Sequence, residues 1–102
     1  MNEQILQQVK NIKETLKKDG FVIDGIFGSY ARDEFTMASD LDLLYHLEDE
    51  FYTKYNGFMG FKKLDEIKSY IAKKINKKID LAPKNNLSKT AKKYILNEVI
   101  YV

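Results

Sequence analysis

Apolar residues recur at helical spacing in three stretches of the chain, which predict three amphipathic helices. The first covers residues 2 to about 19, the second 61 to about 77, and the third runs from Ser88 toward Val99 or beyond. Asn2 and Ser88 are suited to cap helix starts, and Gly20 is suited to end the first helix. The periodic residues are Ile5, Val9, Ile12 and Leu16, then Leu64, Ile67, Ile71 and Ile75, then Leu87, Ala91, Ile95 and Val99.

Three shorter apolar runs, residues 21–27, 40–47 and 78–82, predict β-strands. The second run has apolar residues on both faces, as is typical of a central strand covered on each side. Gly25 inside the first run indicates a bulge or a close backbone approach, and Pro83 should end the third. The fold class is therefore α/β: one domain, 1–102, with a short mixed sheet of about three to four strands flanked by helices.

The remaining segments are less regular. Residues 29–35 favour a short helix or helical turn, and residues 36–39 a loop. Residues 48–60 mix acidic and aromatic residues with two glycines, and we interpret them as a loop with some extended structure. The aromatic residues in and beside this segment could stack on a base, pack in the core or face a partner; they are Tyr52, Tyr55, Phe58 and Phe61.

Composition excludes several classes of protein. The 102 residues contain no cysteine, so there is neither a disulfide framework nor a thiolate metal site. No apolar run approaches the roughly 20 residues of a membrane span, and the N-terminal residues lack a signal-peptide core, so we expect a cytoplasmic protein. The net charge of +2 is too small to indicate nucleic-acid binding by itself. His46 has no second histidine or cysteine as a ligand partner, so we interpret it as structural.

The chemistry concentrates between residues 28 and 44, which read GSYARDEFTMASDLDLL. Asp40 and Asp42 are two residues apart in a predicted strand, so they should share one face at roughly 6–7 Å. Paired carboxylates on a buried strand need a cation, and oxygen ligands suit a divalent metal. Gly28 and Ser29 open a helical turn and could offer N–H groups to a phosphate, and Arg32, the only arginine, could neutralise it. A simpler interpretation is a turn whose acidic residues pair with lysines.

The strings GSYAR and SDLDLL resemble the signature of polymerase-beta-like nucleotidyltransferases, and in particular the minimal nucleotidyltransferase (MNT) group. That group consists of stand-alone domains of about this size, often the antitoxin of a pair with a HEPN-domain toxin. The family usually has glycine where this chain has Asp33, a residue type that tolerates unusual backbone angles. The resemblance covers residues 21 to 80 and extends toward the end of the chain.

The resemblance implies a set of site residues. It places a third aspartate on a neighbouring strand, and Asp80 is the candidate after Asp42 in a strand-like setting. The catalytic and metal-binding residues would then be Asp40, Asp42 and Asp80, with two Mg²⁺ ions, since two metals need more ligand oxygens than two aspartates supply. Gly28, Ser29 and Arg32 would bind the nucleotide. An ordinary solvent-facing strand residue is the alternative for Asp80.

The implied function is transfer of a nucleoside monophosphate, AMP from ATP, to a hydroxyl, namely a tyrosine of a HEPN toxin. Two alternatives stay open: an antitoxin or interaction module that neutralises its partner by binding, and a small-molecule (antibiotic) adenylyltransferase. Enzymes of the latter kind usually carry a further domain for the acceptor, and this chain ends at Val102, so we expect a macromolecular acceptor. We expect no membrane and no direct nucleic-acid partner, and leave open whether the chain forms homo- or hetero-oligomers.

Overall fold

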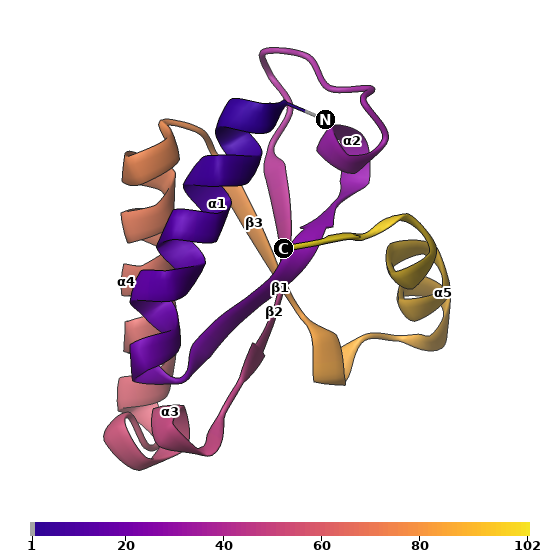
Figure 1. Cartoon of the computed structure of the whole chain (residues 1–102). Helices are drawn as coiled ribbons and strands as arrows, with labels where there is room; N and C mark the ends of the chain where they lie inside the picture. Colours follow the sequence, from indigo (N-terminus) through magenta and orange to yellow (C-terminus); the bar gives the residue numbers. More distant parts are fainter. Residues whose placement is uncertain (1) are drawn as a thin grey trace.

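A computed structural model describes residues 2–102 and consists of five α-helices and a four-stranded sheet in that part of the chain (Figure 1). Two short 3₁₀ segments, η1 and η2, join them. None of the described helices is long and apolar enough to cross a bilayer. The elements in order are α1 (Glu3–Leu16), η1 (Lys17–Asp19), β1 (Phe21–Phe27), α2 (Gly28–Ala31), β2 (Leu41–Leu47), α3 (Asp49–Lys54), α4 (Phe58–Ile75), β3 (Ile79–Pro83), η2 (Lys84–Asn86), α5 (Lys89–Glu98) and β4 (Ile100–Tyr101).

The sheet is mixed, as predicted, and its strand order is β3-β2-β1-β4. β1 pairs antiparallel with β2 and with β4, whereas β2 pairs parallel with β3. The parallel pair is joined through α4, because parallel strands need a long crossover connection. α1 and α4 lie together on one side of the sheet, and α5 lies on the other (Figure 1). β2 is therefore an interior strand, and it has buried apolar side chains on both faces, as its sequence predicted: Leu41, Leu43 and Tyr45 on one and Leu44 on the other.

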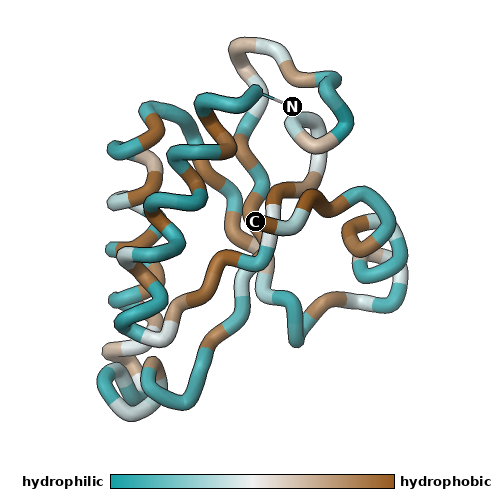
Figure 2. Tube along the Cα trace, in the orientation of Figure 1, coloured by the Kyte–Doolittle hydropathy of each residue, from teal (hydrophilic) through white to brown (hydrophobic). Residues whose placement is uncertain are grey.

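The main core lies between the sheet and the α1–α4 layer. Figure 2 shows hydrophobic positions of α1 and α4 alternating with hydrophilic ones, as an amphipathic helix requires. Burying each large aliphatic side chain contributes about 1.5–3 kcal/mol. The predicted faces of α1 and α4 are confirmed except that Leu64 is only partly buried; their core residues are Ile5, Val9, Ile12, Leu16, Ile67, Ile71 and Ile75. The face predicted for the third helix is only partly confirmed, because Ile95 is buried on α5 whereas Leu87 and Val99 lie outside that helix.

The predicted capping residues agree with the structure, although α1 ends at Leu16 and α4 runs from Phe58 to Ile75, not from 61 to about 77. The side chain of Asn2 accepts hydrogen bonds from the backbone N–H groups of the first turn of α1, and Gly20 follows η1 with a left-handed φ of +83°. Ser88 accepts the Ala91 N–H at 3.1 Å and so caps α5. At the end of α4, Asn76 adopts φ +59° and stops the helix. Each device satisfies backbone groups that the helix itself leaves unpaired.

Residues 48–60 are not the loop that the sequence predicted, because α3 and the start of α4 occupy them. The segment is too short to show a helical repeat of apolar residues, and its helix forms because Phe51 packs into the core. Phe51, on α3, is 2% exposed. Asp49 and Glu50 lie in the first turn of α3, where the helix dipole favours negative charge. A six-residue helix with one buried side chain gives too weak a periodic pattern to be recognised.

The last strand, β4, was also not predicted. Instead of continuing beyond Val99, α5 ends at Glu98, and the chain turns to pair Ile100 and Tyr101 with β1. This pairing explains Gly25, for which the sequence predicted a bulge or a close approach. The register of β1 shifts between Ile23 and Gly25, and a Cβ on Gly25 would lie 2.6 Å from the Ile100 carbonyl oxygen.

Three smaller boundaries differ from those expected. The short helix is α2, Gly28–Ala31, and not 29–35, and the second strand begins at Leu41 and not at residue 40. The third strand is Ile79–Pro83 and not 78–82, and its last residue, Pro83, is paired in register with Tyr45. Pro83 is tolerated because β3 is an edge strand of the sheet and needs no donor on its outer side.

Candidate active site

Two of the three predicted carboxylates lie side by side on neighbouring strands. In the parallel pairing of β2 with β3, Asp42 is directly opposite Asp80. Residues in register on adjacent strands project to the same face, and the strands are about 4.8 Å apart. Asp42 is half-buried and Asp80 is exposed, so the pair opens toward solvent. Asp40 precedes β2 by one residue and therefore lies outside the strand in which the sequence placed it.

The electrostatics of Asp42 show that negative charge gathers at this point. The pKa of Asp42 is raised from 3.8 to about 6, first by burial and then by the charges of Asp80, Asp40 and Glu98. Arg32 opposes this rise, but its effect is smaller than that of each of the others. The same influences show that all three predicted aspartates are close enough to interact.

Gly28 brings the Gly-Ser turn directly against Asp42. Its φ is +74°, and a Cβ at this position would overlap the Oδ2 atom of Asp42 and lie 3.0 Å from its Cγ. A residue with a side chain would therefore be strained in its backbone and would collide with the carboxylate. The structure thus brings Gly28, and with it Ser29 at the start of α2, beside the β2–β3 carboxylates.

Arg32 is held by two carboxylates. Its Nη1 lies 2.7 Å from Glu98 Oε2, and its Nε lies 3.1 Å from Glu34 Oε2. The other oxygen of Glu98 accepts the backbone N–H of Gly28 at 3.0 Å. The residue after Arg32 is Asp33, which adopts the left-handed φ of +56°. Aspartate tolerates this conformation better than most residues.

Glu98 is a site residue that sequence reasoning missed. It lies 70 residues beyond Gly28, at the end of α5. The sequence pattern of α5 indicated only an ordinary amphipathic helix. No local pattern of residues connects it to the motif. The position of Glu98 beside Gly28 follows from the pairing of β4 with β1, and β4, only two residues long, is too short to predict from sequence.

The fit of a divalent metal to these residues can be tested on the carboxylates themselves. Within residues 2–102, no three histidine, cysteine or acidic side chains are arranged to hold a metal ion on their own. Mg²⁺, however, is commonly held by one or two carboxylates together with water and substrate phosphates. The adjacent Asp42 and Asp80, with the charge of Asp40 near enough to act on Asp42, fit that mode of binding.

His46 makes the structural contacts expected for it. Its Nδ1 lies 2.8 Å from Asp24 and its Nε2 lies 3.0 Å from Glu48. Burial lowers the pKa of His46, but the hydrogen bonds and charges of the two carboxylates outweigh this, and the net pKa is raised above 6.5. His46 thus connects β2 with β1 and does not contact the carboxylate cluster.

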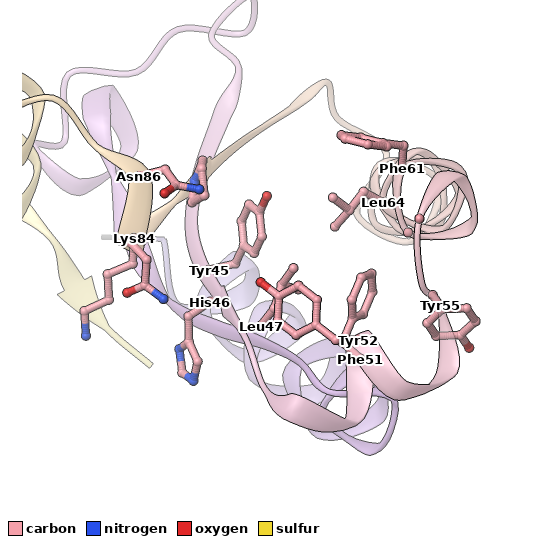
Figure 3. Close-up of a pocket in the computed structure, with 14 residues that line it drawn as sticks. Tyr45, His46, Leu47, Phe51, Tyr52, Tyr55, Phe61, Leu64, Lys84 and Asn86 are labelled. Carbon is pink, nitrogen blue, oxygen red and sulfur yellow. The ribbon is translucent and has the colours of Figure 1, made fainter.

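A cavity of about 390 Å³ lies at the opposite end of β2 from Asp42. Figure 3 shows it between the N-terminal part of α4, α3 and the segment around η2, with the hydroxyl of Tyr45 directed toward this space. Three of the four aromatic residues whose role was open line it, and the fourth, Phe58, is 92% exposed. The aromatic residues of this cavity are Tyr45, Phe51, Tyr52, Tyr55 and Phe61.

Comparisons with known proteins agree with this geometry. Residues 5–102 match the model of the nucleotidyltransferase domain family. The protein adenylyltransferase MntA of Thermococcus cleftensis is 29% identical over 102 residues, which cover 95% of each chain. A solved structure named "putative minimal nucleotidyltransferase" superposes with a TM-score of 0.74 at 22% identity, over 98% of this chain and 94% of the other. A toxin–antitoxin structure with AMP-PNP gives a TM-score of 0.68 at 16% identity, over 99% and 72%.

The two structural likenesses show the fold, and the family match covers almost the whole chain. Gly28 and Ser29, Asp40 and Asp42, and Asp80 all lie within the matched range. The chain therefore belongs to the nucleotidyltransferase domain family and is a nucleotidyltransferase with the fold of the minimal group.

Proposed function

We propose that this nucleotidyltransferase transfers AMP from ATP to a tyrosine hydroxyl of a HEPN-family toxin and so acts as its antitoxin. The observation that carries the proposal is the pairing of Asp42 with Asp80 directly beside the Gly28 turn. The relative from Thermococcus cleftensis bears the name of a protein adenylyltransferase, and a protein of like fold is part of a toxin–antitoxin structure with AMP-PNP, which supports a protein acceptor and an adenine nucleotide.

The residues of the site take the following roles in the proposed reaction. Gly28 and Ser29 bind the β- and γ-phosphates through their backbone N–H groups, and Ser29 also through its hydroxyl. Arg32 neutralises phosphate charge. The acceptor oxygen attacks the α-phosphorus in line, the bond between that phosphorus and the α–β bridging oxygen breaks, and pyrophosphate leaves with the electron pair. Asp80, exposed on the edge strand, takes the proton of the acceptor hydroxyl.

Magnesium belongs to the proposal. Asp40, Asp42 and Asp80 would hold two Mg²⁺ ions together with phosphate oxygens. Bound there, the ions supply positive charge that stabilises the charge on the phosphates. The aspartates contribute by gathering negative charge where a cation can neutralise it, at the cost visible in the raised pKa of Asp42.

A macromolecular acceptor fits the surface beside the site. The loop between Arg32 and Asp40 leads directly into the carboxylates and carries Met37, which is 101% exposed, and Phe35, which is 37% exposed. Apolar side chains presented on a loop next to a reaction site are suited to contact another protein. A hetero-oligomer with the acceptor is therefore part of the proposal, and so is a cytoplasmic location, where ATP is supplied.

The alternative function is neutralisation of the toxin by binding alone. Three carboxylates near one point repel one another, and a purely structural site has no need of them. That cost favours catalysis over occlusion.

The two functions differ in stoichiometry and in the label transferred. A small amount of enzyme with Mg²⁺ and ATP should modify an excess of a candidate toxin, which gains the mass of AMP and the label of α-³²P-ATP. Asp80→Asn should reduce transfer by about 100- to 10,000-fold while leaving nucleotide binding nearly intact. Ser29→Ala should slow transfer without preventing complex formation. Asp65→Asn, which changes an exposed aspartate on α4, is the matched control and should transfer normally.

Neutralisation by occlusion would need stoichiometric protein, would proceed without ATP, and would survive the double change of Asp40 and Asp42 to Asn. That set of results would overturn the proposal.

A further inference from the structure

The carboxylate of Glu98 binds the groups that the proposed function assigns to phosphate. Its Oε1 accepts the Gly28 N–H at 3.0 Å, and its Oε2 pairs with Arg32 Nη1 at 2.7 Å. A guanidinium and a backbone N–H are the donors that bind phosphate oxygens as well as carboxylates. Both oxygens of one anion are thus engaged by two phosphate-binding residues.

The position of Glu98 is fixed by the sheet. β4 pairs antiparallel with β1, with Ile100 opposite Ile26. Glu98 lies two residues before Ile100, at the end of α5, and Gly28 lies two residues after Ile26, so this pairing brings the two residues to the same end of β1. The carboxylate therefore arrives at the Gly28 turn through the backbone register, and its side chain is 22% exposed there.

The anchoring of this segment leaves the side chain able to withdraw. Ile95 is the one buried residue of α5 in the described chain, and β4 contributes two paired residues. A rotation of the Glu98 side chain would free Gly28 and Arg32 without breaking the pairing of β4.

We propose that Glu98 is an internal anion that occupies the phosphate-binding groups while no nucleotide is bound, and that a triphosphate must displace it. The proposal rests on the assignment of Gly28 and Arg32 to phosphate. A ligand that must displace an internal group binds more weakly by the fraction of protein in which that group has withdrawn. Glu98 thereby sets the affinity of the site for the β- and γ-phosphates, and its return competes with pyrophosphate after transfer.

Glu98→Gln is the informative change, because the amide keeps the shape of the side chain and an acceptor for Gly28 but loses the charge that pairs with Arg32. Calorimetric titration of the variant with Mg-ATP and with inorganic tripolyphosphate should show roughly 5- to 30-fold tighter binding than in the wild type. Adenosine, which has no phosphate to compete with Glu98, should gain nothing. The inhibition constant of pyrophosphate should fall in the same direction.

Glu34→Gln is the matched control. Glu34 also pairs with Arg32, at Nε, but does not contact the Gly28 N–H. The Glu34→Gln substitution removes a negative charge from the same guanidinium, but it should change the affinity for tripolyphosphate far less than Glu98→Gln does. An equal gain in both variants that disappears in 500 mM salt would mean general charge screening and would overturn the displacement.

Unchanged or weaker tripolyphosphate binding by Glu98→Gln, with normal binding by the wild type, would overturn the inference and leave the proposed function standing. Binding of tripolyphosphate by neither protein would overturn the phosphate assignment of Gly28 and Arg32, and the inference with it. Tighter binding without AMP transfer to a toxin would support the inference and count against the proposed acceptor.

Discussion

Replacing Asp42 with asparagine should stabilise the metal-free protein. Asp42 is half-buried on β2, next to Asp80 in register, and the charges of Asp40 and Glu98 also act on it. Its ionised form is therefore less favourable in the folded protein than in the unfolded chain. Asparagine has nearly the same shape and no charge, so the substitution removes the repulsion and leaves the packing in place.

The magnitude follows from the pKa. A value of about 6 in place of 3.8 corresponds to a cost of about 3 kcal/mol for the ionised carboxylate. The side chain is only half-buried, and screening by solvent reduces this cost to about 1–2 kcal/mol. In a domain of about 100 residues, that free energy corresponds to a rise in melting temperature of roughly 5–10 °C.

The pH dependence has a definite sign. Between pH 3.8 and about 6 the folded state binds more protons at Asp42 than the unfolded state does. The contribution of Asp42 to stability therefore falls as pH rises through that window, and its full cost is present above pH 6. The advantage of Asp42→Asn should be close to zero near pH 3.8 and largest at pH 7.5.

The assay is urea unfolding of both proteins at pH 4 and pH 7.5 in EDTA, with Asp65→Asn as the control for loss of an exposed carboxylate. A second series with Mg-ATP should reverse the order, since a ligand that binds only the folded wild type stabilises it. A variant that is no more stable than the wild type at pH 7.5, or whose gain is the same at both pH values, would refute the reasoning.

Changes at three further positions test the fold. His46→Gln should cost more stability at pH 5.5 than at pH 8.5, because the raised pKa makes its ion pairs fully effective below about 6.5 and lost as pH rises through the folded value; equal losses would contradict this. Gly25→Ala should lower the free energy of unfolding by about 1–3 kcal/mol, since its Cβ would lie 2.6 Å from the Ile100 carbonyl oxygen, and unchanged urea unfolding would argue against that close approach. Asn76→Gly should raise the free energy of unfolding by about 0.5–1 kcal/mol at φ +59°, whereas Asn76→Ala should lower it, which urea unfolding of the pair would check.

Most of the fold could be predicted because its elements have strong local patterns. α1 and α4 bury one residue in every three or four, and the strand Phe21–Phe27 was predicted with its observed ends. The same reasoning failed at α3 and β4, where one buried phenylalanine and a two-residue pairing decide the structure. Elements of that size form because the rest of the fold offers them a partner, and a single stretch of sequence does not contain that partner.

The candidate site shows the same difference between local and long-range features. The nearness of Gly28 and Asp42 could be predicted because both residues lie in one short segment, 28–44. The position of Asp80 opposite Asp42 depends on a parallel pairing across the whole of α4, and it was expected only through resemblance to a family. Ser29 and Arg32 remain assigned to phosphate as proposals.

Gly25 links the fold to the least predictable part of the site. A glycine inside a strand reads as a weak point, but here its missing Cβ admits the backbone of Ile100 against β1. The antiparallel register that follows from this contact carries Glu98, two residues earlier, onto the Gly28 N–H. A side chain at Gly25 would therefore shift Glu98 relative to the Gly28 N–H and, under the proposed roles of these residues, would alter phosphate binding without contacting the phosphate. The missing Cβ of this one residue thus helps to determine where the Glu98 carboxylate lies.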